Sequence, residues 1–221
     1  MEEEAESAES WLEQEAQKNS EAAEVLKKLK ELYSSKLWHQ LTELVEQHAM
    51  EGALAQGDLL LRLYRNALFP IEGSLSPLRV ARIASAASVG CASTSDALCL
   101  IDGVHNRLSA STARTALHPL LYLRSSRALA LLRGGDAPSA KETIDSCLSE
   151  LDSTIEPDPS VPAAVHFAAS QLHKARQEFA DFYNHGLKYL AYTDTSQLPQ
   201  SQRLVRSSIR PSHSNARVRN I

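Results

Sequence analysis

The chain has 221 residues, with a hydrophobic fraction of 43%, a charged fraction of 23% and a formal net charge of −4. This length suffices for one domain or a short repeat array with a sizeable core. The mild negative charge argues against a nucleic-acid partner, and no apolar run reaches the roughly 18–20 residues that span a bilayer. The acidic start MEEEAESAES is unlike a signal or transit peptide. We therefore expect a cytoplasmic and nuclear protein with reduced cysteines and no membrane partner.

The composition divides the chain into three parts. Residues 1–20 are acidic and poor in large apolar side chains, so we expect them to be largely disordered, with a short helix around Trp11 and Leu12 as the alternative. Residues 21–192 are rich in unbranched helix formers and form the expected α-helical repeat domain. Residues 193–221 are rich in Ser and Arg and hold no acidic residue after Asp194, which predicts a disordered tail.

Apolar residues recur at helical spacing throughout the middle part. Val25, Leu29 and Leu32 begin the pattern, and each later segment repeats it. The fold class that we predict is all-α, with about eight to nine helices. They are expected to cover residues 21–33, 37–49, 59–68, 77–87, 95–108, 119–132, 137–151, 162–172 and 179–190.

Start and stop signals support these boundaries. Ser76 before Pro77 is a helix start, and Ser95 is the expected cap of the fifth helix. Pro119 either kinks a long helix from Ser111 or opens a new one, and we favour a new helix because an interior proline costs about 3 kcal/mol. Gly134-Gly135 ends that helix, whereas the turn near residue 175 has neither Gly nor Pro to mark it.

The helices recur as pairs. Every second helix is expected to start near residues 21, 54, 94, 137 and 176, a period of roughly 35–45 residues. This period is typical of an α-solenoid of the tetratricopeptide or HEAT kind, in which stacked pairs bury each other's apolar faces. The tetratricopeptide consensus is absent, so the array is degenerate. A single helical bundle is the alternative.

No residue pattern indicates catalysis. There is no G-x-S-x-G motif, and Cys91, Cys99 and Cys147 have the spacing of buried, inert thiols. Neither C-x-x-C nor H-E-x-x-H occurs. The remaining metal-ligand candidates are Cys91 and Cys99 with His105, and His166 with His173, seven residues apart on one helix face; packing or surface roles are favoured for all of them.

Two further features have a structural explanation. Gly134-Gly135 follows a helix rather than a strand, so we interpret it as a helix stop and not as a phosphate cradle. Trp38 stands at the start of a helix, where a core anchor is favoured over an exposed binding hot spot. We therefore predict a protein that is not an enzyme, with no catalytic, cofactor-binding or metal-binding residue and no small-molecule substrate.

Several runs resemble one protein family. The run at 29–42, LKELYSSKLWHQLT, is similar to the N-terminal region of the 26S proteasome non-ATPase regulatory subunit 13 family. The similarity covers roughly residues 24–199, with a poorer match at 70–135. Further matching runs, in order, are at residues 55–58, 63–64, 140–144, 182–190 and 193–199.

The resemblance implies a scaffold role. Members of this family have a helical-repeat arm that ends in a PCI domain, and they assemble with other subunits of the lid of the proteasome regulatory particle. We expect a non-catalytic lid subunit that supports ubiquitin-dependent degradation, with other lid subunits as its partners. No PCI pattern follows Pro199, so the resemblance covers the N-terminal part of the family only. The alternative function is an adaptor solenoid that binds peptide motifs of partner proteins.

Overall fold

The computed structural model describes residues 2–49, 52–55, 57–111 and 117–193. These residues form ten α-helices and no strand. Three shorter helical turns, η1 to η3, complete the list. The elements are α1 (Glu2–Lys18), α2 (Ala23–Ser34), α3 (Trp38–Ala49), α4 (Leu59–Leu63), η1 (Tyr64–Leu68), η2 (Phe69–Ser74), α5 (Pro77–Ala87), η3 (Ser88–Gly90), α6 (Thr94–Ser111), α7 (Leu117–Arg133), α8 (Ala137–Asp152), α9 (Ser160–Ala175) and α10 (Phe179–Tyr192).

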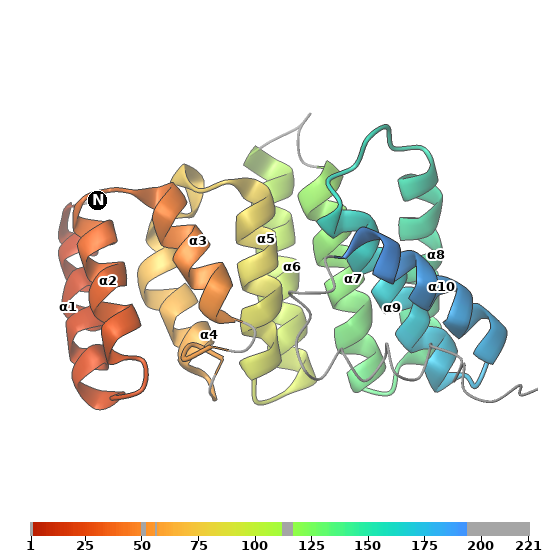
Figure 1. Cartoon of the computed structure of the whole chain (residues 1–221), viewed down its shortest axis with the longest axis horizontal. Coiled ribbons are helices and arrows are strands. Elements are labelled where there is room, and N and C mark those ends of the chain that lie inside the picture. The colour runs from red at the N-terminus through yellow and green to blue at the C-terminus, as the bar shows by residue number, and fades with distance from the viewer. Residues whose placement is uncertain (1, 50–51, 56, 112–116, 194–221) are drawn as a thin grey trace, which may run out of the picture.

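The helices form an elongated array. Figure 1 shows them side by side in chain order, from α1 and α2 at one end to α8, α9 and α10 at the other. Helix α7 packs against α5, α6, α8 and α9, whereas α10 packs mainly against α9. Each helix thus covers the apolar face of its neighbours, which confirms the predicted all-α repeat fold.

The N-terminal segment departs from its prediction. Residues 1–20 were expected to be largely disordered, but Glu2–Lys18 forms helix α1. The few apolar residues of this segment share one face, where Ala8 and Leu12 are buried against α2. The prediction from composition missed this helix because composition counts apolar residues but ignores their spacing along the chain. The additional helix raises the number in the described chain from the expected eight or nine to ten.

Three helix pairs are closed by the same turn. Lys36, Gly135 and Gln177 have φ angles of 55°, 85° and 62°, and each follows the last turn of a helix. In each case the next residue donates its backbone N–H to a carbonyl five residues earlier, the hydrogen bond of a Schellman motif. The helix stop at Gly134-Gly135 and the unmarked turn after Ala175 are therefore both confirmed.

The helix starts agree with the sequence in part. Pro77 lies in the first turn of α5, and Pro119 lies in the first turn of α7, a helix distinct from α6. The prediction that Ser95 caps the fifth helix is wrong. Ser93 is the cap, because its Oγ accepts a hydrogen bond from the Asp96 backbone N–H at 3.0 Å.

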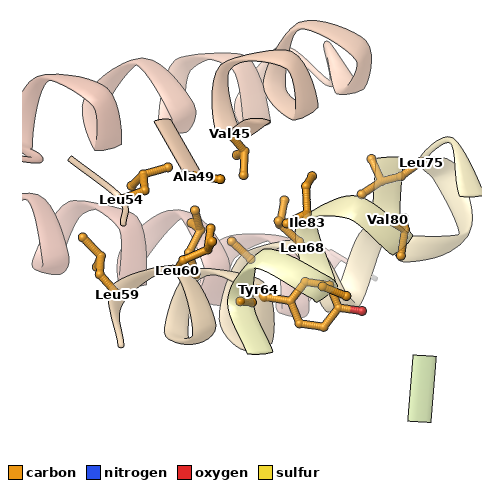
Figure 2. Close-up of a cluster of buried hydrophobic side chains, with 14 of the residues drawn as sticks. Val45, Ala49, Leu54, Leu59, Leu60, Tyr64, Leu68, Leu75, Val80 and Ile83 are labelled. Carbon is orange, nitrogen blue, oxygen red and sulfur yellow. The ribbon is translucent and has the colours of Figure 1, made fainter. Parts of the chain in front are cut away.

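The largest core cluster joins α1 to α7. Figure 2 shows its central part, where Val45 and Ala49 of α3 face leucines of α4 and η1. The expected helix 59–68 is present but widens into a π-helical turn at Tyr64–Leu68. Both end residues of that turn, Tyr64 and Leu68, are buried. Smaller clusters continue the core through α7, α8, α9 and α10.

The expected tail, residues 193–221, lies outside the described residues except for Thr193. Among the helices that the structure describes, none has both the length and the apolar character to cross a membrane.

Candidate functional site

A groove crosses the C-terminal half of the array. It has a volume of about 710 Å³ and lies between α5, α7, α9 and α10. Its lining combines aromatic rings, aliphatic side chains, four serine hydroxyls on α5, η3 and α7, and two arginines, Arg82 and Arg133. Burial raises the pKa of Tyr189 to about 12, so its phenol is neutral at physiological pH. The aromatic lining residues are Tyr122, Phe167, Tyr189 and Tyr192.

The lining of the groove combines apolar walls with a few polar groups. Apolar walls with a few polar groups bind a ligand by burial and fix its orientation by hydrogen bonds. Burial also raises the pKa of Tyr122, a half-buried phenol of the lining. The groove therefore offers aromatic contact area, two cationic side chains and serine hydroxyl oxygens that can accept hydrogen bonds, since Ser88, Ser125 and Ser126 already donate to backbone carbonyls.

The outer face of α10 carries an exposed apolar stripe. Phe179, Tyr183 and Leu187 follow one another at four-residue spacing, and their side chains are 69%, 40% and 44% exposed. Gly186 and Tyr189 of the same helix are buried. An amphipathic helix normally turns polar residues outward. This α10 stripe is thus an apolar surface of the kind that marks protein–protein contacts.

Three histidines meet between α9 and α10. His166 and His173 share one face of α9, as their spacing indicates, and His185 of α10 lies between them. The His185 ring centroid is 5.3 Å from each of the other two, and the Nδ1 atoms of His166 and His185 are 3.2 Å apart. Sequence reasoning missed His185, although it stands on the inner face of the last expected helix.

The surroundings of His166 and His185 favour their neutral rings. Burial, followed by the charge of His185, lowers the pKa of His166 to about 4. Burial and the neighbouring His173 also lower the pKa of His185. A protonated pair would place two positive charges within hydrogen-bonding distance.

The three cysteines differ in their exposure to solvent. Cys147 is buried, and burial raises the pKa of its thiol, as expected for an inert core cysteine. Cys99 is exposed, so the expectation of a buried thiol is wrong there, because its position on α6 faces solvent. In the described residues, the grouping of Cys91 and Cys99 with His105 does not occur among sets of three potential metal ligands.

Trp38 is a partly buried anchor. Its ring packs edge-on against Tyr33 with centroids 5.4 Å apart and contacts the main core cluster. The predicted role of Trp38 as a core anchor is thus correct for the part of its ring that is buried. The remainder is accessible at the start of α3.

A second hollow, of about 430 Å³, lies between α6, α7 and α8 and is lined by charged side chains. The Nε atom of Arg127 is 3.0 Å from Asp102, and Arg124 lies 2.6 Å from Glu150. These charges neutralise one another within the described structure, as in ordinary interhelical ion pairs.

The sequence comparisons identify the repeats. The family profile described as PSD13 N-terminal repeats matches residues 25–208, most of the chain. The chain belongs to the family of 26S proteasome non-ATPase regulatory subunit 13. Two Arabidopsis thaliana relatives, homologs A and B of this subunit, are 36% and 37% identical over 184 and 192 residues. A Dictyostelium discoideum subunit 13 is 25% identical over 177 residues.

The match covers most of this chain but only part of each relative. It includes 83%, 86% and 79% of this chain and 48%, 50% and 44% of the three relatives, respectively. The chain thus spans about half the length of the curated relatives it matches. The groove, the three histidines and the α10 stripe all lie within the range that the family profile matches. Helix α1 precedes that range.

Proposed function

We propose that this chain is the N-terminal repeat arm of a lid subunit of the proteasome regulatory particle, with a non-catalytic scaffold role. Its partners are then other lid subunits, its compartments the cytoplasm and nucleus, and its process ubiquitin-dependent protein degradation. Membership of the subunit 13 family supports this proposal. The relatives are named non-ATPase regulatory subunits, which is consistent with a role in assembly rather than in catalysis.

The α10 stripe is the observation that carries the proposal. In a solenoid each repeat buries its apolar face on a neighbouring element, so an exposed apolar stripe on the last described helix is a surface that another element can cover. Phe179 and Leu187 provide this face, together with the ring of Tyr183. A neighbouring subunit that covers the stripe would remove a large apolar area from water, the main favourable contribution to association.

The test is reconstitution with purified lid subunits. The chain is mixed with the remaining lid subunits, and a variant combining Phe179→Asp and Leu187→Asp is compared with Ile155→Asp. Ile155 lies in the loop before α9 and is 88% exposed, so its change alters an apolar surface residue away from the stripe. We expect the unmodified chain and the Ile155 variant to co-purify with lid subunits, and the stripe variant to be lost.

Circular dichroism of each variant controls for folding. Helix content should be unchanged, because both stripe residues are exposed. The proposal fails if the unmodified chain does not associate. The role of the stripe fails if the double variant is recovered as well as the control.

The groove favours a second candidate, an adaptor that binds extended peptides. Its aromatic lining and its two arginines suit aromatic or acidic side chains of a peptide. Ala164 lines the groove from α9, so Ala164→Arg would obstruct it. On an array of lid-subunit peptides we expect the unmodified chain to retain a defined subset and Ala164→Arg to lose it. Equal retention by the two chains would exclude the groove as the binding site.

A further inference from the structure

The turn between α9 and α10 brings together an unusual residue pair. In a Schellman motif the third residue from the helix end and the second residue beyond it usually form an apolar contact. The α2–α3 turn has Leu32 and Leu37 at these two positions, joined by the Leu37 N–H to Leu32 carbonyl bond. The α9–α10 turn has His173 and Glu178 there, joined by the same backbone bond. A polar pair thus stands where the motif normally places an apolar one.

The side chains of this pair are in direct contact. His173 Nδ1 lies 2.7 Å from Glu178 Oε2. The other carboxylate oxygen, Oε1, lies 3.0 Å from the Arg176 guanidinium, which fixes the orientation of the carboxylate. His173 is itself packed on one face by the His185 ring, with 5.3 Å between centroids and 11° between planes. Two neighbours therefore hold the pair in place.

A third potential ligand completes the cluster. Asp181 stands three residues after Glu178, in the first turn of α10 and on the same side of the helix. His173, Glu178 and Asp181 each offer one ligand atom, and these atoms all lie within 4.8 Å of one another. Among the described residues, this is the one such group of three.

We propose that His173, Glu178 and Asp181 bind a divalent transition-metal ion of the zinc class, with water in the fourth position. Metal–ligand bonds of about 2.0–2.2 Å place the ligand atoms of a tetrahedral ion roughly 3.3–3.5 Å apart. Asp181 is exposed, so a small side-chain rotation can bring it toward the other two, and the 2.7 Å contact between His173 and Glu178 must widen by about 0.6 Å to admit the ion. The imidazole favours zinc over magnesium or calcium, which prefer oxygen ligands alone.

The bound ion would connect the end of α9 to the first turn of α10. Phe179, the first residue of the α10 stripe, directly follows the ligand Glu178. Metal binding would therefore stabilise the helix pair that presents the stripe, because an ion that binds the folded form alone stabilises it by mass action. The site does not depend on the proposed assembly role.

The test is direct binding of zinc chloride to the untagged full chain, by isothermal titration calorimetry and by thermal unfolding, with magnesium chloride as the comparison ion. The variants are His173→Gln with Asp181→Asn, and Glu178→Gln alone as a milder change. The matched control is His39→Gln with Glu43→Gln, an exposed His–Glu pair on α3 with 3.9 Å between Nδ1 and Oε2.

We expect one zinc ion per chain, a higher midpoint of thermal unfolding with zinc and no effect of magnesium. The double variant should lose at least about tenfold in zinc affinity, the Glu178 variant should also weaken it, and the control should match the unmodified chain. Absence of saturable binding would overturn the proposal, as would unchanged affinity in the double variant. An equal loss in the control would show general surface binding instead.

Discussion

Glu15 of α1 accepts a hydrogen bond from Arg62 of α4, with 2.7 Å between Oε1 and Nη1 and a sequence separation of 47. The Glu15 carboxylate is almost fully buried, and the amide of Asn19 also donates to it. The Nε of Arg62 is 3.1 Å from Asp58. This contact connects the N-terminal helix to the repeat array, in a segment whose composition predicts disorder.

We expect Arg62→Met to lower the free energy of unfolding by about 2–4 kcal/mol, because it leaves the Glu15 carboxylate buried without its cation. Urea denaturation measures this change. The double variant Arg62→Met with Glu15→Met should recover much of the loss, since neither charge remains. A loss below about 0.5 kcal/mol in the single variant would show that α1 is held by its apolar face alone.

We expect the stability of the protein to fall as the pH is lowered from about 6.5 to 4, in part through His166. The pKa of its ring is about 4 in the folded protein and about 6.5 in the unfolded chain. In this range the unfolded chain binds more protons, so stability decreases with falling pH. The groups that act on His166 are His185 and Lys188 of α10, which lower its pKa, and Asp152 of α8, which raises it.

The measurement is the urea midpoint at pH 7.5, 6 and 5 in the presence of a chelator, for the unmodified chain and His166→Gln. The histidine accounts for roughly 2–3 kcal/mol over the full interval, at about 1.4 kcal/mol for each pKa unit. Titrating groups away from the histidine cluster are common to both chains and cancel in the comparison, whereas the difference includes any change in His185, which is coupled to His166. Identical pH slopes would contradict the assignment to His166.

Trp38→Ala should reduce the free energy of unfolding by about 2–3 kcal/mol. This is below the usual cost for a fully buried tryptophan, because the ring is only partly covered. The edge-on contact with Tyr33 accounts for part of the loss. Trp38→Phe should cost less, since it keeps an aromatic ring. A change below about 1 kcal/mol for Trp38→Ala would assign the ring to a binding surface instead.

Cys99 should react with a thiol reagent in the native protein well before Cys91 and Cys147. Cys99 is exposed, whereas burial raises the pKa of the other two thiols and reduces their thiolate fraction. Timed alkylation followed by mass spectrometry gives the order. Denaturation in urea should equalise the three rates, and faster native labelling of Cys147 would show that α8 opens locally.

The helices could be predicted because their apolar residues recur every three or four positions, a spacing that places them on one face of a helix. Leu26 and Leu29 on α2 are an example. The N-cap of α6 could not be predicted, because Ser93 and Ser95 are both of a residue type that favours this position. Only the backbone conformation shows that Ser93 is the cap. The histidine cluster could be predicted in part. The spacing of His166 and His173 places them on one face, but the position of His185 depends on how two helices meet across a turn that no Gly or Pro marks.

The neighbour-to-neighbour packing of the array has a consequence for how the chain folds and opens. Because α1 packs mainly on α2 and η1, and α10 mainly on α9, most of the contacts close short stretches of chain. Such contacts form rapidly, since little loop entropy is lost before each one is made. The molecule should therefore open from its two ends, with α1 and α10 exchanging their amide hydrogens sooner than α7 in the middle.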